Sequence, residues 1–149
     1  MEESFNLIIQ RFPRLRFEEK ARIPTLFVES EELLEVARFL KENPELSFNY
    51  LQCLSAVDYL SHLEAVYHFF SYAHEHALVL KVKLDRTAPR IPSVASLWKT
   101  ADWHEREAYD LFGIVFVGHP NLRRILLVDD FEGFPMRKDY KAKGYQGSL

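Results

Sequence analysis

A glutamate within an apolar helix face is the feature of this sequence that most invites a chemical role. The spacing of residues 94–112 predicts one amphipathic helix, and Glu105 falls in the middle of its apolar stripe, formed by Val94, Leu97, Trp98, Ala101, Ala108 and Phe112. A buried carboxylate must be protonated or must meet a cation and hydrogen-bond donors. Two interpretations follow: a structural ion pair with an arginine of the C-terminal segment (Arg123, Arg124 or Arg137), which we favour, and an acid or base tuned for catalysis.

The opposite face of this helix carries a charged row and a tryptophan. Asp102, Arg106 and Asp110 stand at i, i+4 and i+8, so Arg106 has a carboxylate one turn away on each side. Exposed pairs of this kind contribute only about 0.3–0.5 kcal/mol each. Trp103 lies beside the row, and an exposed tryptophan next to an arginine is typical of an interaction hot spot. Cover by a C-terminal segment of the same chain would explain it nearly as well.

Other groups give weaker chemical signals. His74 and His76 share one face of an extended chain, and His104 and His119 lie near acids, but no third metal ligand follows at a tight spacing. Cys53 is the only cysteine, so the chain cannot form an intrachain disulfide or a four-thiolate cluster by itself. There is no nucleophile elbow for a hydrolase. We therefore expect no metal site, no cofactor site and no catalytic residues on this chain.

Composition excludes further classes of function. The chain has 149 residues, 48% of them hydrophobic, which fits one domain over residues 1–149 with a single core. The net charge of −3 argues against nucleic-acid binding, and we expect no membrane span because no apolar run approaches the length of a bilayer. All five glycines follow residue 112, so no glycine-rich loop is present to cradle a nucleotide phosphate.

Periodicity predicts an α+β fold, with helices packed on a mixed, largely antiparallel sheet and an irregular C-terminal segment. Ser4 and Pro13 bound a first helix, a short strand spans residues 25–28, and Ser30 caps a second helix that ends at residue 43. Residues 48–60 are ambiguous between helix and strand. Residues 64–72 and 77–84 form a hairpin, and Ser93 caps the long helix, which ends at Phe112 before Gly113. A core (1–112) and a C-terminal segment (113–149) make up the domain, and a strand at residues 114–117 opens the segment.

Three blocks near the C-terminus resemble a known signature. They are WHEREAYDLFGI at residues 103–114 followed by Phe116, GHPNLRRIL at residues 118–126, and EGFPMRKDY at residues 132–140. Together they resemble the C subunit of NADH-quinone oxidoreductase, the 30 kDa-type subunit of the peripheral arm of respiratory complex I. Met136 departs from the more usual leucine, a nearly volume-conserving change.

The resemblance implies a non-catalytic structural subunit. Members of this family pack against the D-subunit homologue near the quinone site, while NADH, FMN, iron-sulfur clusters and quinone are bound by other subunits. It also implies a peripheral location on the cytoplasmic side of the cell membrane. The candidates for partner contact are Trp103, Arg106, His119, Pro120, Arg137, Lys138, Asp139 and Tyr140, and Glu105 would lock the helix to Arg123 or Arg124.

Alternatives to a complex I subunit stay open. Related subunits occur in membrane-bound hydrogenases and coenzyme-linked dehydrogenases, and the sequence does not reveal the electron donor of the parent complex. A small independent enzyme using Glu105, His104 or His119 as acid and base is a rival of another class. A free-standing binding module is a third.

Overall fold

The computed structural model describes residues 2–142. Within this range the elements follow in the order α1 (Glu2–Arg11), β1 (Arg16–Glu18), β2 (Thr25–Phe27), η1 (a 3-10 turn, Ser30–Glu32), α2 (Leu33–Glu42), β3 (Tyr50–Asp58), β4 (Leu63–Ser71), β5 (His76–Leu84), β6 (Arg90–Pro92), α3 (Ala101–Phe112) and β7 (Val115–Val117). The last seven residues of the predicted segment 113–149, which include Gly144 and Gly147, lie outside the described residues.

The main sheet has five strands in the order β1-β2-β5-β4-β3. Only the β2–β5 pairing is parallel, and the other three are antiparallel. The predicted hairpin is confirmed as β4 and β5, in register from Leu63 opposite Leu84 to Ser71 opposite His76. A separate parallel pair joins β6 to β7. The predicted α+β class with a mixed, largely antiparallel sheet is confirmed.

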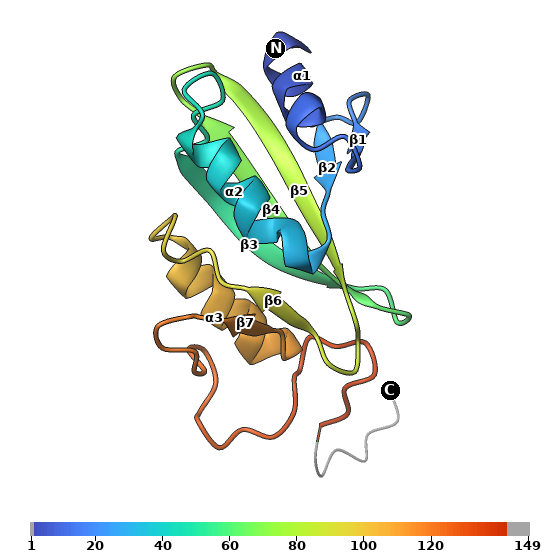
Figure 1. Cartoon of the computed structure of the whole chain (residues 1–149). Coiled ribbons are helices and arrows are strands. Elements are labelled where there is room, and N and C mark those ends of the chain that lie inside the picture. The colour runs from blue at the N-terminus through green and yellow to red at the C-terminus, as the bar shows by residue number, and fades with distance from the viewer. Residues whose placement is uncertain (1, 143–149) are drawn as a thin grey trace.

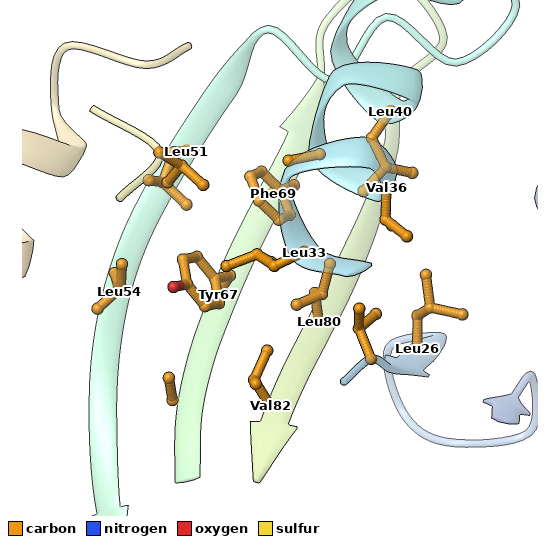
Figure 2. Close-up of a cluster of buried hydrophobic side chains, with 14 of the residues drawn as sticks. Leu26, Leu33, Val36, Leu40, Leu51, Leu54, Tyr67, Phe69, Leu80 and Val82 are labelled. Atoms are coloured by element: carbon orange, nitrogen blue, oxygen red, sulfur yellow. The ribbon is translucent and has the colours of Figure 1, made fainter. Parts of the chain in front are cut away.

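The hydrophobic core lies between the helices and one face of the sheet, here called the inner face. In Figure 1, α2 crosses this face. Figure 2 shows the α2 side chains of Leu33, Val36 and Leu40 directed at Tyr67, Phe69 and Leu80 of the sheet and at other buried side chains. Because strand side chains alternate between faces, every second residue of β4 and β5 contributes to this core. In β3 a register shift between Leu51 and Cys53 interrupts the alternation, so the core residues Leu51 and Leu54 stand three residues apart.

Several predicted boundaries differ from the structure. The ambiguous stretch is strand β3, and β1 and β6 are additional short strands. The predicted caps Ser4 and Ser30 do not cap: α1 already begins at Glu2, and the Ser30 hydroxyl donates to the Arg90 carbonyl. These differences arise because tertiary contacts decide the ends of short elements.

The predicted long helix is shorter than expected. It begins at Ala101 rather than after Ser93, and the preceding residues form turns closed by the amides of Leu97 and Ala101. Gly113 ends the helix as predicted, with a left-handed φ of +79°. A Cβ at this position would lie 2.7 Å from the ring of Phe134, so glycine is required both for the backbone and for the close approach.

After β7 the described chain has no further helix or strand up to residue 142. In Figure 1 this segment loops around the end of the molecule that carries α3 and β7. The predicted irregular C-terminal segment is confirmed for these residues. Its course is set by hydrogen bonds to α3 and to the end of β3, which also position the candidate site.

Candidate docking surface

Glu105 is fully buried and is held by the turn that precedes α3. Its Oε2 accepts a hydrogen bond from the Ser93 hydroxyl at 2.6 Å, and its Oε1 accepts one from the Val94 amide at 2.7 Å. The predicted ion pair of Glu105 with Arg123 or Arg124 is therefore wrong, because the Ser93 hydroxyl and the Val94 amide supply the hydrogen bonds of this carboxyl group instead. The late start of α3 is the reason: residues 93–100 fold back beside the helix and bring these donors to the carboxyl group.

Burial favours the protonated form of this carboxyl group. Desolvation raises the pKa of Glu105 above its usual value, although the hydrogen bonds from Ser93 and Val94 act in the opposite direction. Among residues 2–142 the buried hydroxyl of Tyr67 has no hydrogen-bond partner. Burial, and to a smaller extent the Glu105 charge, raises the pKa of Tyr67 well above its ordinary value. Glu105 is closed off from solvent, so a substrate cannot reach it in this conformation.

We expect Glu105→Gln to flatten the dependence of stability on pH. Because the folded state holds the Glu105 proton more tightly than the unfolded chain, stability falls as the pH rises from about 4.3 through the raised pKa. Glutamine is neutral; its oxygen can accept from the Val94 amide and its NH2 group can bond to the Ser93 hydroxyl. The variant should therefore be at least as stable as the wild type near pH 7.

Urea unfolding at several pH values between 4 and 8 measures this effect. Glu107→Gln is the matched control, because Glu107 is exposed on the same helix. If the pH dependence of the unfolding free energy persisted in Glu105→Gln and disappeared in Glu107→Gln, Glu105 would not be the residue that causes it.

Asp110 is the acid that holds the C-terminal segment. It is fully buried, and its Oδ1 accepts from Arg124 Nη1 at 2.8 Å. Its Oδ2 accepts from three successive backbone amides at distances between 2.7 and 3.1 Å, those of Ile125, Leu126 and Leu127. Burial alone would raise the pKa of Asp110, but Arg124 and the three amides lower it below its ordinary value. The predicted exposed row with Arg106 is thus wrong for Asp110, since residues 122–127 cover this face of α3.

Arg106 and Arg124 both clamp the segment to the helix. Arg106 donates from Nε and Nη2 to the carbonyls of Arg123 and Arg124, each at 3.2 Å. Arg124 also donates to the carbonyls of Asp110 and Gly133. The Arg106 guanidinium lies 5.5 Å from the centre of the Trp103 ring. Arg106 thus links the exposed tryptophan to the covering segment.

His119 fastens the turn after β7 to the start of α3. Its side chain is buried, and its Nε2 lies 3.1 Å from the Asp102 carbonyl oxygen and 3.0 Å from Asp102 Oδ1. The Asn121 amide donates to Nδ1 at 2.9 Å, so Nδ1 carries no proton and Nε2 is the donor to Asp102. Pro120 remains exposed and lines a shallow hollow with Lys99 and Asp102.

The third signature block is fastened to a second buried acid, Asp58 at the end of β3. Asp58 pairs with Arg86 and accepts from the amides of Leu60 and Lys138, each at 2.8 Å. Arg86 also pairs with Asp139 at 2.8 Å. Burial would raise the pKa of Asp58, but Arg86 and the two amides hold it far below its usual range.

Arg137 and Tyr140 contact the same segment and the end of α3. Arg137 Nε donates to the Phe112 carbonyl at 2.7 Å, and its guanidinium lies over the ring of Phe134. Tyr140 stacks on Phe131 with 6.3 Å between ring centroids. The candidates therefore fall into two groups, one at the start of α3 and one around Asp58.

Large apolar side chains stand exposed on α3 and along the C-terminal segment that is bonded to it. Trp103 is 65% exposed, and Leu126, Val128 and Met136 are each more than half exposed. Leu126 and Val128 were missed in the sequence, because turn-rich residues carry no periodic signal that separates outward from inward side chains. The clamp on Asp110 fixes the backbone from which Leu126 projects. Fixed apolar groups of this kind suit a contact with another protein.

His74 of the β4–β5 loop and His76, the first residue of β5, hold the chain that follows α2. His74 Nε2 lies 2.7 Å from the Pro44 carbonyl oxygen, and His76 Nε2 lies 3.1 Å from that of Leu46. Within residues 2–142 no group of three or more histidine, cysteine, aspartate or glutamate side chains has the arrangement of a metal site. In the same part of the chain, no helix combines the length and apolarity needed to cross a bilayer.

Fold and surface together define a small α+β protein whose charged signature residues hold its own C-terminal segment and leave apolar side chains exposed. The family of the 30 kDa subunit of respiratory-chain NADH dehydrogenase matches residues 26–146, and the chain belongs to this family.

Relatives of the chain are NADH-quinone oxidoreductase C subunits. The one from Chloroherpeton thalassium is 56% identical over 110 residues, which cover 72% of this chain and 46% of the relative, so the chain spans about half of that protein's length. The one from Moorella thermoacetica is 44% identical over 144 residues, with 95% of this chain and 96% of the relative covered.

The fold is also found in solved structures. The trypsin-resistant fragment (1–134) of Nqo5 superimposes with a TM-score of 0.71 at 29% identity, covering 82% of this chain and all of the fragment. A chain of the membrane-bound sulfane sulfur reductase, an archaeal respiratory membrane complex, superimposes with a TM-score of 0.79 at 25% identity. That match covers 94% of this chain and 85% of the other.

Proposed function

We propose that this chain is a non-catalytic structural subunit in the hydrophilic arm of a proton-translocating NADH:quinone oxidoreductase or a close relative. It docks on the D-subunit homologue near the quinone site, on the cytoplasmic side of the membrane. NADH, FMN, iron-sulfur clusters and quinone are bound by other subunits. The supporting observation is that Arg106, Arg124 and Asp110 bond to groups of this same chain, while Trp103 beside them stays 65% exposed.

A parent complex with another electron acceptor is the second candidate. The likeness to a chain of the sulfane sulfur reductase complex extends over 94% of this chain, so the same scaffold serves a complex of that kind as well. In either complex the role of this chain is to position its neighbours. An independent enzyme that uses Glu105 and His119 as acid and base is disfavoured because Glu105 is buried and both ring nitrogens of His119 are hydrogen-bonded within the chain, to Asp102 and Asn121.

Trp103→Ala should weaken docking while leaving the isolated chain folded. An exposed ring contributes little to the core, whereas truncation of a tryptophan at the centre of an interface typically lowers affinity by about tenfold or more. The variant and the wild-type chain are expressed together in the host, and the complex that contains the D-subunit homologue is purified. The measurement is the ratio of variant to wild-type chain in that complex.

Ile9→Ala is the control, because Ile9 is an apolar residue of α1 that is 42% exposed. The tryptophan variant should be depleted about tenfold, and the isoleucine variant should be recovered equally with the wild type. Equal recovery of Trp103→Ala would count against α3 as the docking surface.

A further inference from the structure

The outer face of the main sheet has no helix packed on it within residues 2–142. Side chains of the helices and of the 93–100 turn contact the inner face, as in the ring contacts of Phe5 with Phe17 and of Trp98 with Phe69. Strand pairing gives the cross-sheet rows of the outer face. These rows are Tyr50, Phe70 and Ala77; Cys53, His68, Val79, Thr25 and Glu18; Ser55, Val66, Lys81, Phe27 and Arg16; and Val57, Glu64 and Lys83.

A groove of about 430 Å³ crosses this face between the loop before β2 and the edge strand β3. Val66 and Val79 form its apolar floor, and Val57 and Tyr59 at its β3 side are 37% and 46% exposed. Ser55 of β3 lies exposed on the same side of the groove. The groove thus offers an apolar floor that a few inserted side chains could fill.

Cations outnumber acids in the groove. Arg22 and Lys81 line it together with one carboxylate, Glu64, which lies 3.9 Å from Lys81. Within the described chain Arg22 is exposed and has no acidic partner, and Lys83 stands opposite Glu64 in the strand register. Glu18 stands opposite Thr25 of this face in the strand register and pairs with Arg16 at 2.9 Å, and Glu29 and Glu32 line the neighbouring hollow. This excess of positive charge occurs on a chain whose net charge is −3.

We propose that this groove docks a segment of another subunit that carries apolar side chains flanked by aspartate or glutamate. The apolar side chains contact Val66 and Val79, and the acidic ones pair with Arg22 and Lys81. This contact is separate from the α3 surface and lies on a different part of the chain. This proposal rests on the proposed function only in that a second protein must be present for the groove to bind.

Charge favours this occupant over a second copy of the chain. In a two-fold contact the same patch faces itself, which would bring Arg22 and Lys81 toward their own equivalents. A foreign acidic segment instead gains attraction from both cations.

Photo-crosslinking in the assembled complex tests the proposal. A benzophenone amino acid placed at Ser55 is irradiated in the complex isolated from the host, and the captured peptide is sequenced by mass spectrometry. We expect a peptide of another subunit with an aspartate or glutamate within about one helical turn of the crosslinked residue. Arg22→Glu should lower the crosslink yield about tenfold. Arg38→Glu, an exposed arginine of α2 on the other side of the sheet, should leave the yield unchanged.

Several outcomes would overturn the proposal. These are capture of lipid, of a second copy or of this chain itself; capture of a peptide without acids; no product; or a yield that Arg22→Glu does not change. If the Ser55 probe prevents assembly while the isolated chain keeps its melting temperature, bulk in the groove blocks docking, which supports the proposal. A probe at Trp103 in the same complex separates the two contacts, since its capture of the D-subunit homologue is independent of Arg22.

Discussion

Asp110→Ala should lower the free energy of unfolding by about 3–5 kcal/mol, the cost of stranding a buried charge. The substitution leaves the Arg124 guanidinium, whose side chain is only 10% exposed, without its counter-charge. It also removes the acceptor of three backbone amides in residues 125–127. The described segment from residue 122 onward should then separate from α3.

Urea unfolding at pH 7 measures this loss. Asp129→Ala is the matched control, because Asp129 is an exposed aspartate of the same segment, and its change should stay within about 0.5 kcal/mol. Asp110→Asn should fall between the two, since it keeps the shape of the side chain but not its charge. Small and equal losses of unfolding free energy for Asp110→Ala and Asp129→Ala would show that Asp110 does not hold residues 124–127 against α3.

Asp58→Ala should release the third signature block from the end of β3. We expect a loss of about 2–3 kcal/mol, less than for Asp110 because the Arg86 side chain is 15% exposed and keeps its pair with Asp139. The Lys138 amide loses its acceptor. Trypsin should therefore cut after Arg137 and Lys138 about ten times faster than in the wild type.

Proteolysis and urea unfolding together check this release, with Asp130→Ala as an exposed aspartate control. Unchanged cleavage in Asp58→Ala would contradict it. The wild type adds a test by pH: the pKa of Asp58 is depressed in the folded state, so its contribution is complete above about pH 5 and is lost as the pH falls below the unfolded value of about 3.9.

The sequence predicted the architecture better than the site. Alternation in β5 and the helical spacing of α2 were visible, because both elements bury one face and expose the other. The start of α3 was not visible, because residues 93–100 have helical spacing and yet fold as turns.

The start of α3 at Ala101 explains why the predicted ion pair of Glu105 was wrong. Ser93, expected to cap the helix, instead donates to Glu105, and the arginine expected there pairs with Asp110. Helical spacing indicated a buried acid correctly at Glu105, but it placed Asp110 on an exposed face. The irregular segment that covers Asp110 has no periodicity, and its course depends on contacts distant in the sequence.

The fastened segment explains how a chain with few regular elements at its C-terminus can present a fixed surface. Asp110 accepts hydrogen bonds from three backbone amides of this segment and Asp58 accepts one, from Lys138, so the backbone is held at two places. Side chains such as Leu126 and Met136 project from this backbone in a fixed arrangement, which lowers the entropic cost of docking.

Turnover per assembled complex in a Glu105→Gln variant tests most directly the claim that this chain is a scaffold rather than a catalyst. The complex is purified from the host, the amount of this chain in it is quantified, and NADH:quinone turnover is divided by that amount. A structural role predicts turnover equal to the wild type, because the neutral amide retains hydrogen bonds to Ser93 and Val94. Turnover that is lost in a complex assembled at the normal level would contradict the account and make Glu105 a participant in the reaction.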